Sequence, residues 1–103
     1  MTAPQRQAVY FVACFTTTFR SMEEVRAAAP EALARHLAQS KELQAKGDLL
    51  MAGAFLENGD GPVTTMGVLR TREAAEAYAK ADPFVQNGMV SAWTVRAWAN
   101  ILD

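Results

Sequence analysis

One imidazole and one carboxylate are the side chains of this sequence whose types could do chemistry together. His36 is the only histidine of the chain, and Asp82 stands directly before Pro83. A carboxylate that accepts a hydrogen bond from one ring nitrogen fixes the tautomer of an imidazole and leaves the other nitrogen to take or give a proton. The two residues would form an oriented general acid–base if the fold brings them together.

Each of these residues also has a plainer explanation. A lone histidine at the edge of an apolar helical stripe is more often a hydrogen-bonded core residue. An aspartate before a proline at a helix end commonly just forms a turn. From His36 and Asp82 alone, the functional and the structural explanation both stay open.

The composition indicates one small globular domain. The chain has 103 residues, half of them hydrophobic and a fifth charged, with a formal net charge of −1. This length suits a single domain, which we expect over residues 1–103, with residues 1–7 as a flexible N-terminus. No cluster of Lys and Arg is present, so nucleic acid is not an expected partner, because its binding depends on many phosphate contacts.

The single cysteine and the N-terminal segment indicate the compartment. Cys14 lies in an apolar run, where we expect a buried structural thiol rather than a nucleophile, and one cysteine suits a reducing compartment. No signal-peptide segment and no run of the ~20 apolar residues of a membrane span is present. We therefore expect a cytoplasmic protein that binds no membrane. One histidine and one cysteine do not make the usual zinc site, and we expect neither metal nor other cofactor.

The elements that must position His36 and Asp82 follow from the hydrophobic pattern. Residues 8–16 are apolar on both faces, which is typical of an interior strand. Ser21 can cap a first helical segment, and Pro30 restarts a helix that carries His36. Gly47 follows Lys46 and should end that helix as its C-cap.

The second half of the chain is predicted to contain two strands, a helix and a last strand. Residues 48–57 and 63–70 are strand-like and are joined by the turn-forming residues 58–62, which predicts a hairpin. Thr71 should cap a helix over residues 72–81, ended by Asp82-Pro83. A short turn over residues 84–88 and a strand over residues 89–98 follow. The order predicts an α+β, ferredoxin-like βαββαβ sandwich with an antiparallel sheet and helices on one face.

The strands are apolar on both sides, although the helices of this fold cover only one. A large uncovered apolar face marks an interface. We therefore expect a homodimer in which two sheets pack face to face, and a larger assembly stays open.

Three segments carry a resemblance to a known family. They are His36-Leu37, leading through Gly47 into Leu49-Leu50-Met51-Ala52-Gly53; Thr71-Arg72-Glu73-Ala74-Ala75; and Ala81-Asp82-Pro83-Phe84-Val85, with Gly88 and Thr94-Val95-Arg96-Ala97-Trp98. With them the chain resembles the YciI-like proteins, the YCII-related domain family of the dimeric α/β-barrel group. That family often has Arg-Pro shortly before the histidine and Pro after the Ala-Gly. Here Leu33-Ala34-Arg35 and Ala54 stand there, which leaves open whether Arg20, Arg26 or Arg35 supplies an anion contact.

The resemblance implies a function for the two candidate residues. His36 would be the general base or acid and Asp82 the residue that orients it, in an isomerase or a dehydrochlorinase (a lyase-like reaction) without redox cofactor. The substrate would be a small cyclic compound that can carry hydroxyl groups. Candidate pocket residues are Gly53, Phe55, Phe84 and Trp93, although aromatic residues at strand spacing more often belong to the core.

Two other functions stay open. In a non-catalytic ligand-binding or dimerisation module, His36 and Asp82 would form a buried polar contact, and replacing His36 would cost stability without changing any chemistry. In a haem protein, His36 would be the axial ligand, as a single helical histidine is in related dimeric barrels, and a Soret band would reveal it.

Overall fold

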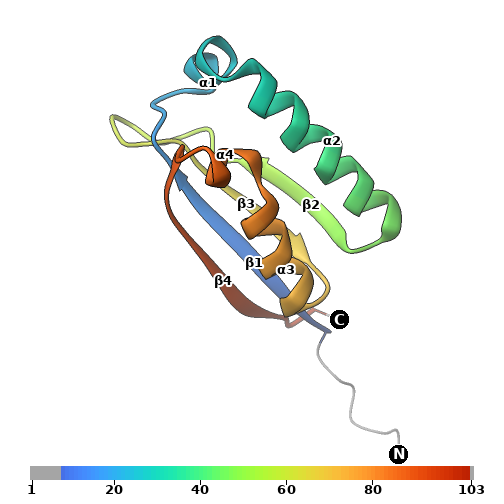
Figure 1. The fold of residues 1–103 in the computed structure, drawn as a ribbon. Coiled ribbons are helices and arrows are strands. Elements are labelled where there is room, and N and C mark those ends of the chain that lie inside the picture. Colours follow the sequence, from blue (N-terminus) through green and yellow to red (C-terminus); the bar gives the residue numbers. More distant parts are fainter. Residues whose placement is uncertain (1–7, 103) are drawn as a thin grey trace, which may run out of the picture.

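Residues 8–102, which the computed structural model describes, form an antiparallel sheet with all helices on one of its sides (Figure 1). The strand order is β2-β3-β1-β4. The strands are β1 (Ala8–Thr17), β2 (Leu49–Ala54), β3 (Thr64–Leu69) and β4 (Val90–Asn100). The prediction that β1 is an interior strand is confirmed, since it pairs with β3 and β4. The flexible N-terminus expected over residues 1–7 lies outside the described residues.

The first three helices begin and end where the sequence predicts, and a short fourth helix follows them. The helices are α1 (Met22–Ala28), α2 (Pro30–Lys46), α3 (Arg72–Ala81) and α4 (Pro83–Gln86). The Ser21 hydroxyl accepts the N–H of Glu24 at 3.0 Å and caps α1. Thr71 caps α3 in the same way. Gly47 ends α2 in the left-handed conformation, with φ 84°, which a residue without Cβ adopts most readily.

The short turn expected after Asp82 is a one-turn helix instead. Asp82 Oδ1 accepts the N–H of Phe84 at 3.3 Å, and Pro83 at the first helical position already has a helical φ. These two features together start α4 directly after α3. Asp82 thus ends one helix and caps the next, which restrains its side chain at the junction.

The last strand is longer than the pattern predicts. β4 runs to Asn100 because it stays paired with β1 as far as Ala8. Within this pairing Phe15 lies opposite Trp93 in β4 and opposite Thr65 in β3. These three side chains therefore share the face of the sheet that the helices cover.

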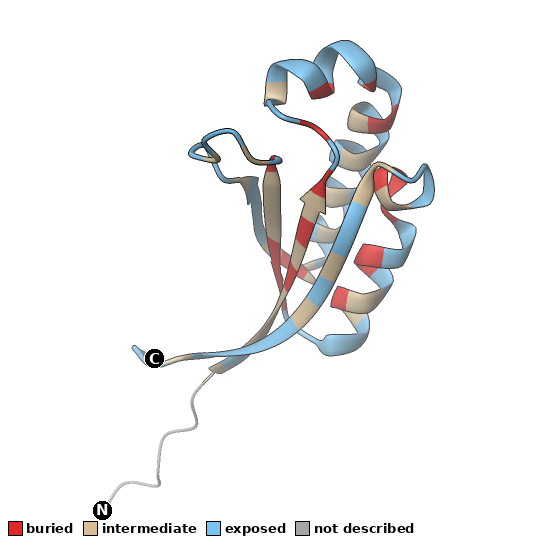
Figure 2. Ribbon diagram, turned by 90° about the vertical axis from the view of Figure 1, so that its left-hand side faces the viewer, coloured by how far each residue is buried: buried red, intermediate tan, exposed pale blue. Residues whose placement is uncertain are grey.

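The core lies between the sheet and the helices, where Figure 2 shows most of the buried residues. One cluster lies under α3 and a second lies between α1, α2 and α4. The first contains Ala13, Phe15, Leu49, Leu69, Ala75, Tyr78 and Ala79, and the second Phe19, Val25, Ala29, Ala32 and Phe84.

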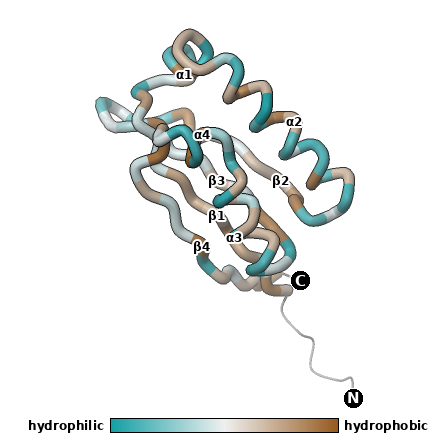
Figure 3. The backbone as a smooth tube through the Cα atoms, in the orientation of Figure 1, coloured by the Kyte–Doolittle hydropathy of each residue, from teal (hydrophilic) through white to brown (hydrophobic). Residues whose placement is uncertain are grey.

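Helix α2 packs loosely against the rest of the domain. Apolar and hydrophilic residues alternate along it (Figure 3), yet of its 17 residues only Ala32 is buried. The helix crosses the β2 side of the sheet (Figure 1). Because so little of α2 is buried, space remains between this helix and the sheet.

Within residues 8–102, no helix covers the other face of the sheet. Cys14 belongs to this face, because alternate residues of β1 point away from the helices. The residue is partly exposed in the single chain and not buried as expected, and its structural role stays a prediction. Met51 and Trp98, on the same face, are 64% and 52% exposed. Among the described helices none is long and apolar enough to cross a bilayer.

Candidate functional site

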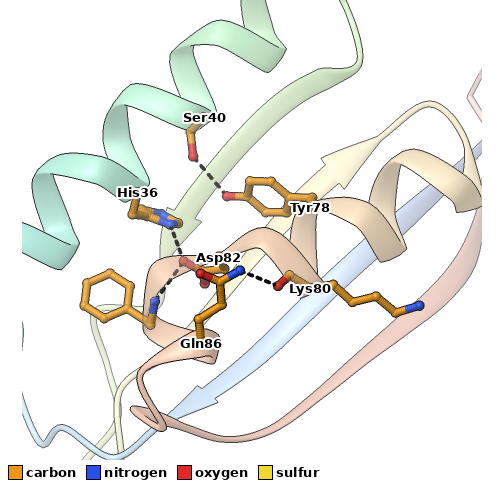
Figure 4. Close-up of polar contacts among 7 residues, drawn as sticks. His36, Ser40, Tyr78, Lys80, Asp82 and Gln86 are labelled. Carbon is orange, nitrogen blue, oxygen red and sulfur yellow. Dashed lines mark hydrogen bonds and ion pairs between the residues drawn. The ribbon is translucent and has the colours of Figure 1, made fainter.

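The fold brings the histidine and the aspartate together. His36 Nδ1, on α2, lies 3.1 Å from Asp82 Oδ1 at the end of α3 (Figure 4). The Asp82 side chain is only 4% exposed and that of His36 is 23% exposed. An ionised carboxylate can only accept, so Nδ1 carries the hydrogen, and Nε2 lies on the opposite side of the ring with its lone pair.

The backbone at the junction of the two helices restrains the carboxylate. Asp82 has φ −62° and ψ 126°, an extended conformation that a following proline favours. Its Oδ1 accepts from the N–H of Phe84 as well as from His36. Two donors therefore compensate for the burial of this charge, as a buried carboxylate requires.

A second polar contact links the same two helices. Ser40 Oγ lies 3.1 Å from the Tyr78 hydroxyl oxygen (Figure 4). Ser40 follows His36 by one helical turn, and Tyr78 precedes Asp82 by one turn, so each helix presents a pair of polar residues on one face. Ser40 and Tyr78 are site residues that the sequence pattern did not predict. The signal that could have found them is this i, i+4 spacing on both helices.

Burial changes the ionisation of Tyr78. It raises the pKa of the hydroxyl above its usual value, the hydrogen bond with Ser40 partly offsets this rise, and the negative charge of Asp82 adds to it. The phenol is therefore protonated at neutral pH and can donate a hydrogen bond.

Two aromatic rings hold the imidazole in place. The centroid of the His36 ring lies 5.6 Å from that of Phe84 and 6.2 Å from that of Tyr78. Phe84 in turn packs edge-on against Phe19 in the second core cluster. The histidine is thus held by packing as well as by its hydrogen bond to Asp82.

A cavity of about 280 Å³ opens between α2 and the sheet, and all four polar residues lie in its wall. The remaining wall is mostly apolar and includes Phe15, Phe19, Leu33, Leu49 and Val63. This is close to the lower end of the volumes of small-molecule sites, which are mostly apolar with a few placed polar groups.

The four pocket residues expected from the sequence lie in different places. Gly53 and Phe84 line the cavity. Phe55 does not, because β2 ends before it, and it borders a second hollow at Met51 and Met66. Trp93 does not either, because it packs against the core cluster under α3.

Lys41 is the cation in the wall of this cavity, as far as the described residues show. Arg20, Arg26 and Arg35, the expected alternatives, do not line it; Arg20 donates to the carbonyl of Asp60 on the loop between β2 and β3. An anion contact at this cavity would therefore come from Lys41. Within residues 8–102 no group of three His, Cys, Asp or Glu side chains could hold a metal ion.

Comparison with known sequences gives one match. The sequence profile of the YCII-related domain matches residues 11–99. No protein of curated function matches the chain.

Solved structures share the fold. The 5-chloro-2-hydroxyhydroquinone dehydrochlorinase of Burkholderia phenoliruptrix, in complex with 2,5-dihydroxybenzoquinone, is 21% identical with a TM-score of 0.60, over 86% of this chain and 92% of that chain. A putative antibiotic biosynthesis monooxygenase of Nitrosomonas europaea is 9% identical, with a TM-score of 0.56 and 96% of each chain covered. PA3566 of Pseudomonas aeruginosa is 11% identical, with a TM-score of 0.53, over 96% of this chain and 99% of that one. These likenesses confirm the predicted ferredoxin-like fold.

Proposed function

The chain belongs to the YCII-related domain family, and from this premise we propose that it is a small-molecule enzyme whose His36–Asp82 pair transfers protons. The observation that carries the proposal is the 3.1 Å contact between an almost fully buried carboxylate and an imidazole in the wall of a mostly apolar cavity. The arrangement has the parts of a general acid–base: a base, a group that orients it and room for a substrate.

In this mechanism Asp82 accepts the Nδ1 hydrogen and holds the ring so that Nε2 takes the proton. A general base of this kind contributes ~10²–10⁴-fold to a rate. That is enough for a substrate whose proton is already acidic, such as a ring hydroxyl or a carbon next to a carbonyl. The apolar wall excludes water and strengthens the interaction between the imidazolium and the developing anion.

The reaction that we propose is an isomerisation or a dehydrochlorination of a small hydroxylated ring compound. Nε2 removes the proton of one ring hydroxyl and returns it to the ring carbon that carries chlorine, which gives the keto tautomer. It then removes the proton of a second hydroxyl, whose electron pair forms a new carbonyl and shifts a ring double bond to that carbon, while chloride leaves with the electron pair of its bond. The net change is loss of HCl, and no electrons enter or leave. In the isomerisation the imidazolium returns the proton to another atom. The structural likeness to a dehydrochlorinase supports this choice of reaction.

The test is turnover of 5-chloro-2-hydroxyhydroquinone, followed by chloride release. We expect His36→Asn to lower the rate by roughly 10²–10⁴-fold. Asp82→Asn should lower the rate less, because the base itself is still present. The rate should still fall, because asparagine can cap α4 but carries no charge to balance the imidazolium. Gln39→Ala, at an exposed position on the same helix, is the control and should react like the wild type.

The outcome that contradicts catalysis is equally specific. If His36→Asn lowers the stability and leaves the rate of chloride release unchanged, the pair is a buried polar contact. The protein is then a binding module.

We propose further that the protein acts as a homodimer through the sheet face that carries no helix. Met51 and Trp98, together with the neighbouring Phe55, leave much apolar surface exposed on the single chain. A face of this kind is typical of an interface.

A further inference from the structure

We propose that Tyr78 is a second ligand-contacting residue of the cavity, whose hydroxyl binds an oxygen atom of the ligand while Ser40 positions that hydroxyl. The inference rests on the proposed function, because it assigns a partner to His36 at the same site. Its basis is the pair of cross-helix contacts, His36 with Asp82 and Ser40 with Tyr78, which lie one helical turn apart in the wall of one cavity.

The Tyr78 ring is held rigidly enough to place its hydroxyl. The residue is 6% exposed, and its ring packs edge-on against Phe15 with centroids 6.0 Å apart and planes at 76°. The aromatic part belongs to the core, whereas the hydroxyl reaches Ser40 at the cavity. A buried tyrosine with one polar end in this position is suited to orienting a ligand.

The hydroxyl keeps hydrogen-bonding capacity beyond its contact with Ser40. A phenol has one hydrogen to donate and two lone pairs to accept with, and Ser40 uses one of these positions. When Ser40 donates, the Tyr78 hydrogen is left for the ligand. Because burial holds this phenol in its protonated form, Tyr78 donates to the ligand and does not compete with His36 as a base.

The distribution of polar groups around the cavity indicates the class of ligand. Four of the polar residues lie together where α2 faces the end of α3 (Figure 4), and the rest of the wall is mostly apolar. Its other polar residues are Thr17, Lys41, Gln44 and Thr65. A flat ring with oxygen atoms along one edge fits this arrangement. One oxygen would give its proton to His36 while Tyr78 binds a neighbouring one.

The experiment compares two probes of equal shape, catechol and o-xylene. In o-xylene, methyl groups replace the two hydroxyls of catechol. Binding is followed by nuclear magnetic resonance titration of wild type and Tyr78→Phe. We expect the substitution to raise the Kd of catechol by roughly 3- to 10-fold, the effect of one hydrogen bond between neutral groups. The Kd of o-xylene should change less than about 2-fold, because the ring and its packing remain.

A second variant guards against loss of folding in the first. Ser40→Ala places a good helix former at a half-buried helical position. It should raise the Kd of catechol by about 2- to 3-fold and leave the Kd of o-xylene unchanged, since it removes only the group that positions the Tyr78 hydroxyl. If both variants bind catechol like the wild type, the inference is overturned.

Two other outcomes overturn it as well. If Tyr78→Phe raises the Kd of catechol and of o-xylene equally, the contact between Ser40 and Tyr78 only holds the helices together. A wild type that binds neither probe would have no such site. The proposed catalysis fails separately, since it depends on chloride release by His36→Asn and not on the selectivity of Tyr78→Phe.

Discussion

At the scale of single residues, Asp82 joins the site to the fold. Its carboxylate accepts from His36 and from the N–H of Phe84, and its backbone ends α3 before Pro83. A longer carboxylate could not cap α4 and meet the imidazole from the same place, because capping suits short side chains. The residue is therefore expected to matter for stability as well as for activity, which is why asparagine is the informative substitution.

Tyr78 is expected to titrate above the ordinary value of a tyrosine. Burial raises its pKa, and the described groups that face it are His36, Ser40 and Asp82. The protein has two tyrosines, so the difference in tyrosinate absorbance between wild type and Tyr78→Phe isolates this hydroxyl. Its midpoint should lie above about 10.

The sign of the effect on stability follows from linkage. The folded protein binds the Tyr78 proton more tightly than the unfolded chain does. The contribution of this proton to stability is complete below about pH 10 and is lost as the pH rises through the folded pKa. Tyr78→Phe should flatten the stability curve in this alkaline window. A midpoint at or below 10 would contradict the expectation.

At the scale of secondary-structure elements, α2 determines the shape of the cavity, because it forms one wall and packs loosely. Its position depends on its packing against β2, α4 and α1, and on the two contacts with Asp82 and Tyr78. Both ends are set by local sequence, with Pro30 in the first turn and Gly47 after the last. The ends of the helix are therefore set locally, while its packing leaves room for a ligand beneath it.

Gly47→Ala tests how much the left-handed conformation at the C-terminal end of α2 contributes to stability. The residue has φ 84° with nothing within 4 Å of an added Cβ, so the substitution changes only the backbone preference. We expect a loss of about 1–2 kcal/mol in the free energy of unfolding, measured by urea denaturation. Gly53→Ala is the matched control, since its added Cβ also meets nothing and its φ is not positive. Equal stability of the two variants would contradict this explanation.

At the scale of the whole molecule, the sheet has one covered and one uncovered face. The covered face holds both core clusters and the cavity. The uncovered face presents exposed Met51 and Trp98, and the Trp98 ring lies beside Tyr10 with centroids 6.2 Å apart. Dimerisation through this face would leave the cavity on the other side of the sheet except along β2, where Met51 and Gly53 line it.

The wild type is expected to be a dimer at micromolar concentration and Met51→Glu largely a monomer. The substitution places a charge where the proposed interface buries apolar surface, and an unpaired buried charge is costly. Light scattering coupled to size-exclusion chromatography gives the mass directly. Gln39→Glu adds the same charge on an exposed position of α2 and should leave the mass unchanged. A wild type that is monomeric at every concentration would refute the proposed interface.

The order of the elements, most of their ends and the family all follow from the amino-acid sequence. Caps such as Ser21, Thr71 and Gly47 act within one helical turn, and hydrophobic alternation marks each strand, so neither needs distant contacts. The sequence also indicates His36 and Asp82, through the family resemblance of the segments around them, and their catalytic role stays a prediction. The α4 helix could have been expected from the same local chemistry, since Asp-Pro is a capping residue followed by a good first helical residue.

Which side chains share the cavity depends on how the elements pack in three dimensions. Tyr78 and Ser40 meet because α2 and α3 pack at one particular distance and rotation, whereas Trp93 enters the core and Phe55 falls beyond the end of β2. The cavity itself exists because α2 stands off the sheet with one buried residue. Local patterns specify which face of each element is apolar. How closely two such faces approach depends on the packing of the whole domain.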